Sequence, residues 1–542
     1  MREIITLQLG QQSNYLANHF WNTQESYFTY SADQESPIDH DVHFRPGLGS
    51  DGTETFMPRT VIYDLKGGFG TLRKINSLYE IDGDPTSSSL WSGQTVVQRQ
   101  QPIEASAYQQ SLDSGQATSE LTTSTVRYWS DFNRVYFHPK SIIQLSEYEL
   151  NSTIMPFEKW HMGEELFASL DKEHDLLDRD LRPFAEEADQ IQGLQVMTGI
   201  DDAWGGFAAK YMERLRDEYG KTPIWVFGAQ EPSRGLPREK RLLKLVNKAR
   251  SLTELNSQAS LVIPLALPES PLPSTIQLDA SSSWHVSAFF AAALESVTLY
   301  TRLKTSDRVY GSNLGNMTDL LNVFGKQTIA NLEMSISEAP KPHQNGTNGT
   351  NGDANGLNGR GEHVHSPNEN SMDVDDTSES GSQKGAATLD IDLSSPQELN
   401  LDLGGRKRRK RHIFSQVLSD RGLQNLEPTT NEEMELREQS IHGMRRRPKV
   451  HNYRSPVAFP IIDSYPRIFR DRYGHPVREN ISVKTALSTD STVTDKVKAL
   501  RSTVIRYIGL EDRETIGNEL AEIADSYKEG WSSDSDEDDD DE

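Results

Sequence analysis

The sequence predicts an α/β fold in which helices flank a mostly parallel, Rossmann-type β-sheet. The chain opens with a strand that turns at a glycine into a helix (residues 2–21), and strands then alternate with helices from residue 191 to 302. Alternation of this kind is typical of βα units. The composition changes near Glu338, which predicts a long disordered insertion before a smaller α+β C-terminal region.

The first 21 residues are the clearest local signal. Arg2–Leu9 alternates and is rich in Ile, Leu and Thr, as in a buried strand, and Gln11–Trp21 has the spacing of an amphipathic helix. Gly10 separates them. A glycine turn from a strand into a helix is the geometry that aims backbone N–H groups at a phosphate.

Three further strand–helix units follow the same pattern. The predicted strands are Ile191–Met197, Pro223–Ala229 and Ser260–Leu267, and the helices after them are residues 204–215, Pro237–Leu255 and Trp284–Arg302. The C-terminal region, 413–530, contains two more predicted helices, Asp495–Ile508 and Asp512–Ala524.

Composition excludes several classes of protein. The 542 residues leave room for two or three domains, and the absence of cysteine excludes disulfides, thiolate catalysis and cysteine zinc sites. The 14 histidines form no metal-binding cluster, and no hydrolase or P-loop motif is present, so no metal site and no catalytic residue are predicted. The formal charge of −25 makes nucleic-acid binding an unfavoured function.

The ends of the chain and its apolar stretches bear on location. We expect no transmembrane segment, signal peptide or mitochondrial presequence, because the chain begins directly with a strand and its apolar stretches are short. The acidic tail, 531–542, contains eight acids in its last nine residues.

The predicted disordered linker, 336–412, has two parts. An Asn-Gly repeat (345–359) and a Ser/Asp/Glu-rich stretch cannot bury enough apolar surface to offset chain entropy. A basic run, Arg406–Arg411, follows. It fits either a solvated linker or a patch for nuclear import or anionic lipid.

Several segments resemble tubulin. The opening MREI, the Gly10-Gln11 pair and Phe20-Trp21 match the start of a tubulin, and Phe56–Leu65 resembles its aromatic-x-PR-x-VxxDL strand. Ser464–Phe469 resembles the short strand that opens tubulin's intermediate domain. These matches imply a tubulin/FtsZ-like fold with GTP as the ancestral ligand.

The glycine-rich phosphate loop of that family is degenerate here. Its flanks, Gly193–Thr198 and Glu213–Tyr219, match tubulin, but the loop between them reads Gly199-Ile-Asp-Asp-Ala-Trp-Gly-Gly206. The residues of this degenerate phosphate loop that bear on ligand binding are Gly199, Asp201, Asp202, Gly205 and Gly206.

Asp201 and Asp202 stand where a phosphate would have to lie. A carboxylate 4 Å from a phosphate charge is repelled by about 4 kcal/mol at an effective dielectric of 20, more than the ~0.3–1 kcal/mol of a helix dipole. We therefore expect one of these acids to cap the helix itself. A magnesium ion held by both acids is the open alternative.

The other ligand positions are mixed. Asp64 matches the acid of tubulin's second loop, but Lys66 replaces the metal-associated Glu, and no GxLNxD catalytic loop is evident before the insertion that follows residues 320–322. The resemblance implies a vestigial nucleotide site made by Gly10, Gln11, Gln12 and Asp64. No cofactor is expected, although GTP with magnesium stays an alternative.

The eroded loop and enlarged insertion identify the chain as similar to the Misato/DML family of tubulin-like proteins. A Misato-type N-terminal segment (1–120) would precede a tubulin/FtsZ-like segment (121–335). The resemblance implies a cytoplasmic, non-catalytic protein associated with the mitochondrial outer surface, acting in mitochondrial distribution and mitochondrial DNA inheritance.

Its expected partners are proteins of the mitochondrial surface or cytoskeleton, and self-association is possible. Two alternatives stay open: a GTP-binding switch of the tubulin superfamily, and a nuclear or chromatin-linked adaptor that uses the basic run.

Overall fold

The computed structural model describes residues 2–29, 35–48, 52, 54–72, 103–268, 271–304, 313–338, 387–394, 411–422 and 448–528. The Asn-Gly repeat, residues 406–410 of the basic run and the acidic tail lie outside these ranges. Predictions about those segments therefore stay predictions.

The centre of the fold is a six-stranded, wholly parallel sheet in the order β5-β4-β1-β6-β7-β8. The predicted α/β class is thereby confirmed. Its strands are β1 (Glu3–Leu9), β4 (Thr60–Lys66), β5 (Ile142–Glu149), β6 (Ile191–Gly199), β7 (Ile224–Ala229) and β8 (Leu261–Leu265).

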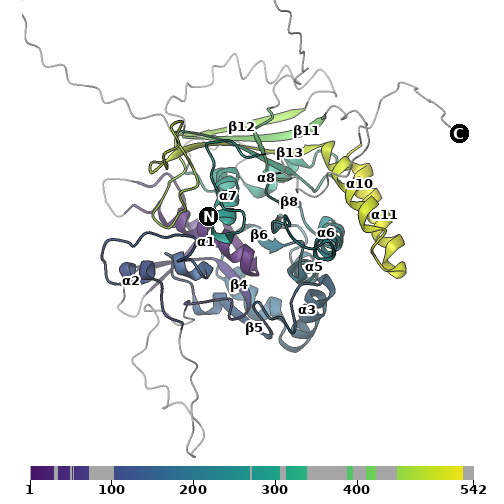
Figure 1. Cartoon of the computed structure of the whole chain (residues 1–542), viewed down its shortest axis with the longest axis horizontal. Helices are drawn as coiled ribbons and strands as arrows, with labels where there is room; N and C mark the ends of the chain where they lie inside the picture. The colour runs from purple at the N-terminus through teal and green to yellow at the C-terminus, as the bar shows by residue number, and fades with distance from the viewer. Residues whose placement is uncertain are drawn as a thin grey trace, which may run out of the picture.

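Along each strand, successive side chains point to opposite faces of this sheet. Both faces are apolar and are covered by helices, which gives two cores. Ile4 and Ile62 point into one core, and Ile5 and Val61 into the other. The helices of the first core are α1 (Gln11–Glu25) and α7 (Ser283–Thr298). Those of the second are α3 (Trp160–His174), α5 (Ala203–Glu218) and α6 (Arg238–Gln258), as Figure 1 shows.

A second, mixed sheet lies across α7 in the order β10-β9-β13-β11-β12 (Figure 1). Its strands are β9 (Asn331–Glu338), β10 (Ile391–Asp392), β11 (Ile413–Arg421), β12 (Lys449–Ser455) and β13 (Ile481–Asp490). β9, which follows α8 (Leu314–Leu321), extends to Glu338, and β10 lies wholly within the predicted disordered linker, 336–412. These parts of the predicted linker are ordered, because β9 pairs with β13 and β10 pairs with β9.

Short elements and a helical hairpin complete the fold. The short elements are α2 (Ala107–Asp113), α4 (Arg182–Glu186), a π-helical turn (Leu177–Leu181) and the hairpin β2 (Phe44–Leu48) with β3 (Glu54–Pro58). The helical hairpin is α10 (Thr492–Val504) and α11 (Leu510–Ser526), which packs on α6.

Of the two segments that resemble tubulin strands, one is divided and the other forms no strand. Phe56–Leu65 is divided at Arg59, whose backbone N–H donates to the His43 carbonyl. The part before Arg59 belongs to β3 and pairs with β2 in the hairpin, and only the part after it, β4, joins the central sheet. Ser464–Phe469 forms no strand. Only Phe469 makes a single bridge, to Ile276, and Pro466 has no N–H to extend a ladder.

A buried ion cluster joins the second sheet to α7 and α1. Glu295 of α7 accepts from Arg302 Nη2 at 2.7 Å and is paired with Arg421 of β11, and all three side chains are buried. Arg421 also donates to Tyr27 Oη at 2.8 Å. Burial lowers the pKa of Arg302 to about 9. One carboxylate thus serves two buried guanidinium groups.

Removal of Glu295 should therefore destabilise the fold more than removal of Arg421. Glu295→Gln leaves two buried cations without a counter-charge and should lower the free energy of unfolding by about 3–5 kcal/mol. Arg421→Met leaves the neutral Glu295–Arg302 pair and should lower it less. Urea denaturation of both variants checks this order, with the exposed Arg506→Ala as control. A larger loss in Arg421→Met would contradict the charge argument.

Candidate functional site: a filled crevice at the strand ends

The candidate site lies where the strand order reverses. From β1 the chain goes to β4 and β5 on one side, and then to β6, β7 and β8 on the other. Ligands of open α/β sheets bind outside the carboxyl ends of strands at such a switch point. The structure brings the candidate residues Gly10–Gln12, after β1, and Gly199–Asp202, after β6, to this edge.

The indole of Trp204 fills the space between these two loops. A Cβ atom on residue 10 would lie 2.3 Å from Trp204 Nε1, so the ring rests directly on Gly10, whose φ is +83°. Trp204 is 5% exposed and packs edge-on against Phe157 and Phe207, with ring centroids 5.3 and 5.6 Å away. The place where an anionic ligand would meet the first loop is occupied by a side chain.

The sequence analysis placed residue 204 at the start of a helix but did not predict the contact of its side chain with Gly10. Helical periodicity shows which face a side chain is on, not how far it reaches across a sheet edge. The sequence did contain a signal for this contact: a bulky aromatic residue, Trp204, within the degenerate glycine loop, and a glycine, Gly10, retained in the first loop.

Asp202 makes the predicted helix cap. Its Oδ1 accepts from the Trp204 backbone N–H at 2.9 Å, at the first turn of α5. Burial, with Asp201 and Glu231 nearby, raises the pKa of Asp202 to about 8. Since a raised pKa favours the neutral carboxyl group, Asp202 repels an anion less than the ionised carboxylate that the sequence argument assumed.

Asp201 is neutralised in another way. Its Oδ2 accepts from the Glu231 N–H and from Lys244 Nζ, each at 3.1 Å, and Lys244 also binds Glu231 at 2.9 Å. Burial raises the pKa of Asp201. A magnesium ion at this carboxylate would have to displace the Lys244 ammonium.

A small cavity of about 40 Å³ lies beside this ion pair, between Asp201, Gln230, Lys244 and Leu267. It has room for roughly three water molecules. Among the described residues, no group of three or more His, Asp or Glu side chains is placed to hold a metal ion. The structure therefore offers no prearranged space for a nucleotide next to Asp201.

The remaining candidate ligands bind one another. Gln11 Nε2 donates to Asp64 Oδ2 and to the Gly68 carbonyl, both at 2.6 Å, and Asn14 Nδ2 donates to the same carboxylate oxygen at 2.7 Å. Burial raises the pKa of Asp64 to about 7, although these donors oppose the shift. Gln12 Nε2 donates to the Gln230 carbonyl at 3.0 Å. These polar groups are used within the protein.

Gly205 and Gly206 lie inside α5 and serve helix packing. A Cβ atom on Gly205 would lie 2.0 Å from Ser251 Oγ of α6, and one on Gly206 would lie 2.0 Å from the Trp160 carbonyl of α3. The facing Gly163 of α3 is equally close to the Ala203 carbonyl, at 1.7 Å. Gly205 and Gly206 therefore allow α3, α5 and α6 to approach closely.

Comparison with known proteins places these features in context. Residues 2–114 match the Misato Segment II tubulin-like domain, and residues 118–303 match a tubulin domain. The chain is 53% identical to Protein dml-1 of Neurospora crassa and 47% identical to Protein DML1 of Gibberella zeae, with 100% of each chain covered. It is 34% identical to Protein dml1 of Schizosaccharomyces pombe over 61% of this chain and 72% of that relative.

The packing role of the glycines predicts a specific loss of stability. Gly206→Ala should lower the free energy of unfolding by about 1–3 kcal/mol, because the new methyl group meets backbone rather than a side chain that can move. Gly220→Ala, whose Cβ would lie 3.6 Å from the nearest atom, is the matched control. Equal stabilities of the two variants in urea denaturation would refute the packing role.

The raised pKa of Asp202 predicts a pH dependence. A carboxyl group with a folded-state pKa near 8 and an unfolded-state value near 4 favours the folded state in its protonated form. Its contribution is complete below about pH 4 and is lost as the pH rises towards 8. Asp202→Asn keeps the cap and should flatten the decline in stability between pH 5 and 8, whereas Asp217→Asn, on the exposed side of α5, should not.

Proposed function

Because the chain belongs to the Misato/DML family of tubulin-like proteins, we propose that it is a non-catalytic scaffold that acts in mitochondrial distribution and mitochondrial DNA inheritance. The proposal has two parts. The first is that the crevice at the switch point does not turn over nucleotide. The second is that the protein acts through protein partners at the mitochondrial outer surface or the cytoskeleton.

The first part is supported by the position of Trp204. Its indole lies against Gly10 at the sheet edge where a phosphate would bind, and Gln11 and Asp64 are hydrogen-bonded to each other. A nucleotide would have to displace a buried aromatic ring that contacts Phe157 and Phe207. That displacement opposes binding and leaves the fold as a framework for contacts with other proteins.

The second part rests on the family resemblance. It includes the proposal that the protein is located on mitochondria and in the cytoplasm. None of the helices within the described ranges has the length and apolar character needed to cross a membrane. Attachment through a surface protein or lipid headgroups is consistent with that finding.

A GTP-binding switch is the second candidate, and one observation favours it. The N-terminus of α1 has no side-chain cap and no acid in its first turn, which suits an anion. Trp204 would have to swing out for this function. The nuclear or chromatin-linked adaptor would use the six basic residues Arg406–Arg411. One of them, Arg411, is paired with Glu333 and Asp490 within the fold, which counts against this alternative.

Nucleotide titration tests the non-catalytic reading. The wild-type protein with magnesium should show no micromolar affinity for labelled GTP and no turnover. Trp204→Ala should bind pyrophosphate more tightly than the wild type, because the space over Gly10 is opened. Leu215→Ala removes a buried apolar side chain from the same helix, about three turns from Trp204, and is the matched control. Micromolar GTP binding with turnover by the wild type would refute the proposal.

Cell biology tests the second part. Depletion of the protein should fragment or cluster mitochondria and reduce the amount of mitochondrial DNA per cell. A fluorescent fusion should mark the mitochondrial periphery, and it should do so equally in a variant without residues 406–410, which keeps the paired Arg411. Normal mitochondria after depletion, with nuclear signal that depends on those residues, would favour the adaptor.

A further inference from the structure

Three segments that are distant in the sequence adjoin one another at the start of α6. They are the loop before α3 (150–159), the first turn of α6 with the residues before it (234–241), and the turn between α10 and α11 (505–507). Lys240 Nζ lies 2.8 Å from Glu158 Oε1, which joins the first two segments. Arg238 Nη2 donates to Tyr507 Oη at 2.8 Å, which joins the second and third. We call the surface formed by these segments the α6 corner.

The loop before α3 presents two adjacent apolar side chains to solvent. Ile154 is 90% exposed and Met155 is 53% exposed. Hydrogen bonds hold the loop: the Met155 N–H donates to Ser152 Oγ at 3.2 Å, and the Leu150 N–H donates to the Lys66 carbonyl at 3.0 Å. The two apolar side chains are therefore exposed on a loop of defined shape.

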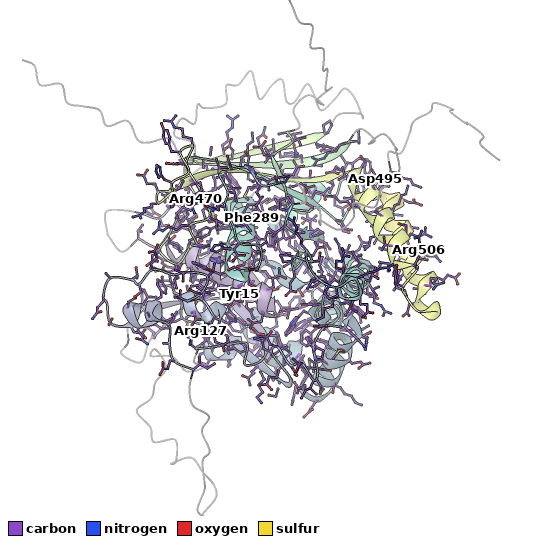
Figure 2. The ribbon with its side chains drawn as sticks, viewed as in Figure 1. Tyr15, Arg127, Phe289, Arg470, Asp495 and Arg506 are labelled. Atoms are coloured by element: carbon purple, nitrogen blue, oxygen red, sulfur yellow. The ribbon has the colours of Figure 1, made fainter. Side chains whose placement is uncertain are left out.

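Cations outnumber acids in the α6 corner. Its segments contain six cations and two acids, Glu158 and Glu239, on a chain with a net charge of −25. Figure 2 shows Arg506 at the periphery of the molecule, on the side formed by the α10–α11 hairpin. The exposed cations of the corner that have no ion-pair partner among the described residues are Lys159, Arg234, Arg238, Arg241 and Arg506. The corner is thus a local basic surface on an acidic protein.

We propose that the α6 corner binds the surface of a membrane that contains anionic lipid, with Ile154 and Met155 inserted among the headgroups. An anionic membrane attracts Lys and Arg side chains, each of which strengthens adsorption about fivefold. Apolar side chains add to this attraction when they enter the boundary between headgroups and acyl chains. The inference rests on the proposed location at the mitochondrial outer surface, for which it supplies a means of attachment.

The shape of the corner favours a membrane over an acidic protein as the partner. A stable protein interface buries roughly 800 Å² on each partner around an apolar, closely packed centre. The α6 corner instead offers two apolar side chains on a loop tip with cations beside them. The cavity next to Lys244, on the same helix, is about 40 Å³ and holds only a few water molecules, so it cannot receive a peptide. A layer of headgroups needs no groove.

Sedimentation of the full-length protein with lipid vesicles tests the role of the cations. The wild type should sediment with vesicles of phosphatidylcholine mixed with phosphatidylserine, but not with vesicles of phosphatidylcholine alone. Arg234→Glu with Arg241→Glu should weaken binding at least about 25-fold, because two attractive charges are lost. Arg472→Glu with Arg478→Glu makes the same charge change on another exposed turn and should bind as the wild type does.

A second pair of variants tests the apolar tip. Ile154→Ser with Met155→Ser should weaken vesicle binding by more than about tenfold, because methylene groups no longer leave water. Leu48→Ser, at a position that is 70% exposed on the β2–β3 hairpin, is the control and should bind normally. Added salt should reduce the effect of the charge variant, since salt screens exposed charges, and should leave the effect of the apolar variant.

Three results would overturn the proposal. The first is a wild type that does not bind the phosphatidylserine vesicles, and the second is equal binding by the wild type and both variants of the α6 corner. The third is binding to purified mitochondria that is lost when protease removes their surface proteins, which would assign the corner to a protein partner. Vesicle binding by the corner together with normal mitochondria after depletion would contradict the proposed function and leave the membrane contact standing.

Discussion

The contact between the Trp204 indole and Gly10 is the constraint on which our account of this tubulin-like fold depends. It lies between β1 and β6, at the position where the strand order reverses. A parallel sheet leaves polar backbone groups at its carboxyl edge, and in nucleotide-binding relatives a ligand meets them. Here a buried side chain occupies that edge, and its burial stabilises the folded protein without any ligand.

The polar residues around this contact bind one another or their neighbours. Asp202 accepts from the Trp204 N–H at the start of α5, Lys244 pairs with Asp201, and Gln11 donates to Asp64. Each of these contacts satisfies a group that would otherwise be available to phosphate or metal. The Glu295 cluster holds the second sheet against α7, so the two sheets form a single framework. These contacts support the view that the architecture persists without nucleotide chemistry.

Sequence patterns predicted the central sheet well, because buried parallel strands and amphipathic helices have strong periodicity. They predicted that Asp201 or Asp202 would cap a helix, because a carboxylate at that position has few other uses. They could not show that Lys244, on α6 and 43 residues from Asp201, pairs with it, since that contact depends on how α6 packs against the sheet edge. For the same reason, the electrostatic argument against phosphate was too strong, and the steric obstacle formed by Trp204 was not predicted. The division of Phe56–Leu65 between two sheets was equally hidden, because both parts have strand character.

The most direct measurement is a crystal structure determined after exposure of the protein to GTP and magnesium. The account predicts that the Trp204 ring stays on Gly10, with Gln11 bound to Asp64 and no nucleotide between β1 and β6. Density for a guanine nucleotide at that edge, with the Trp204 ring displaced and a metal ion in place of the Lys244 ammonium, would contradict it.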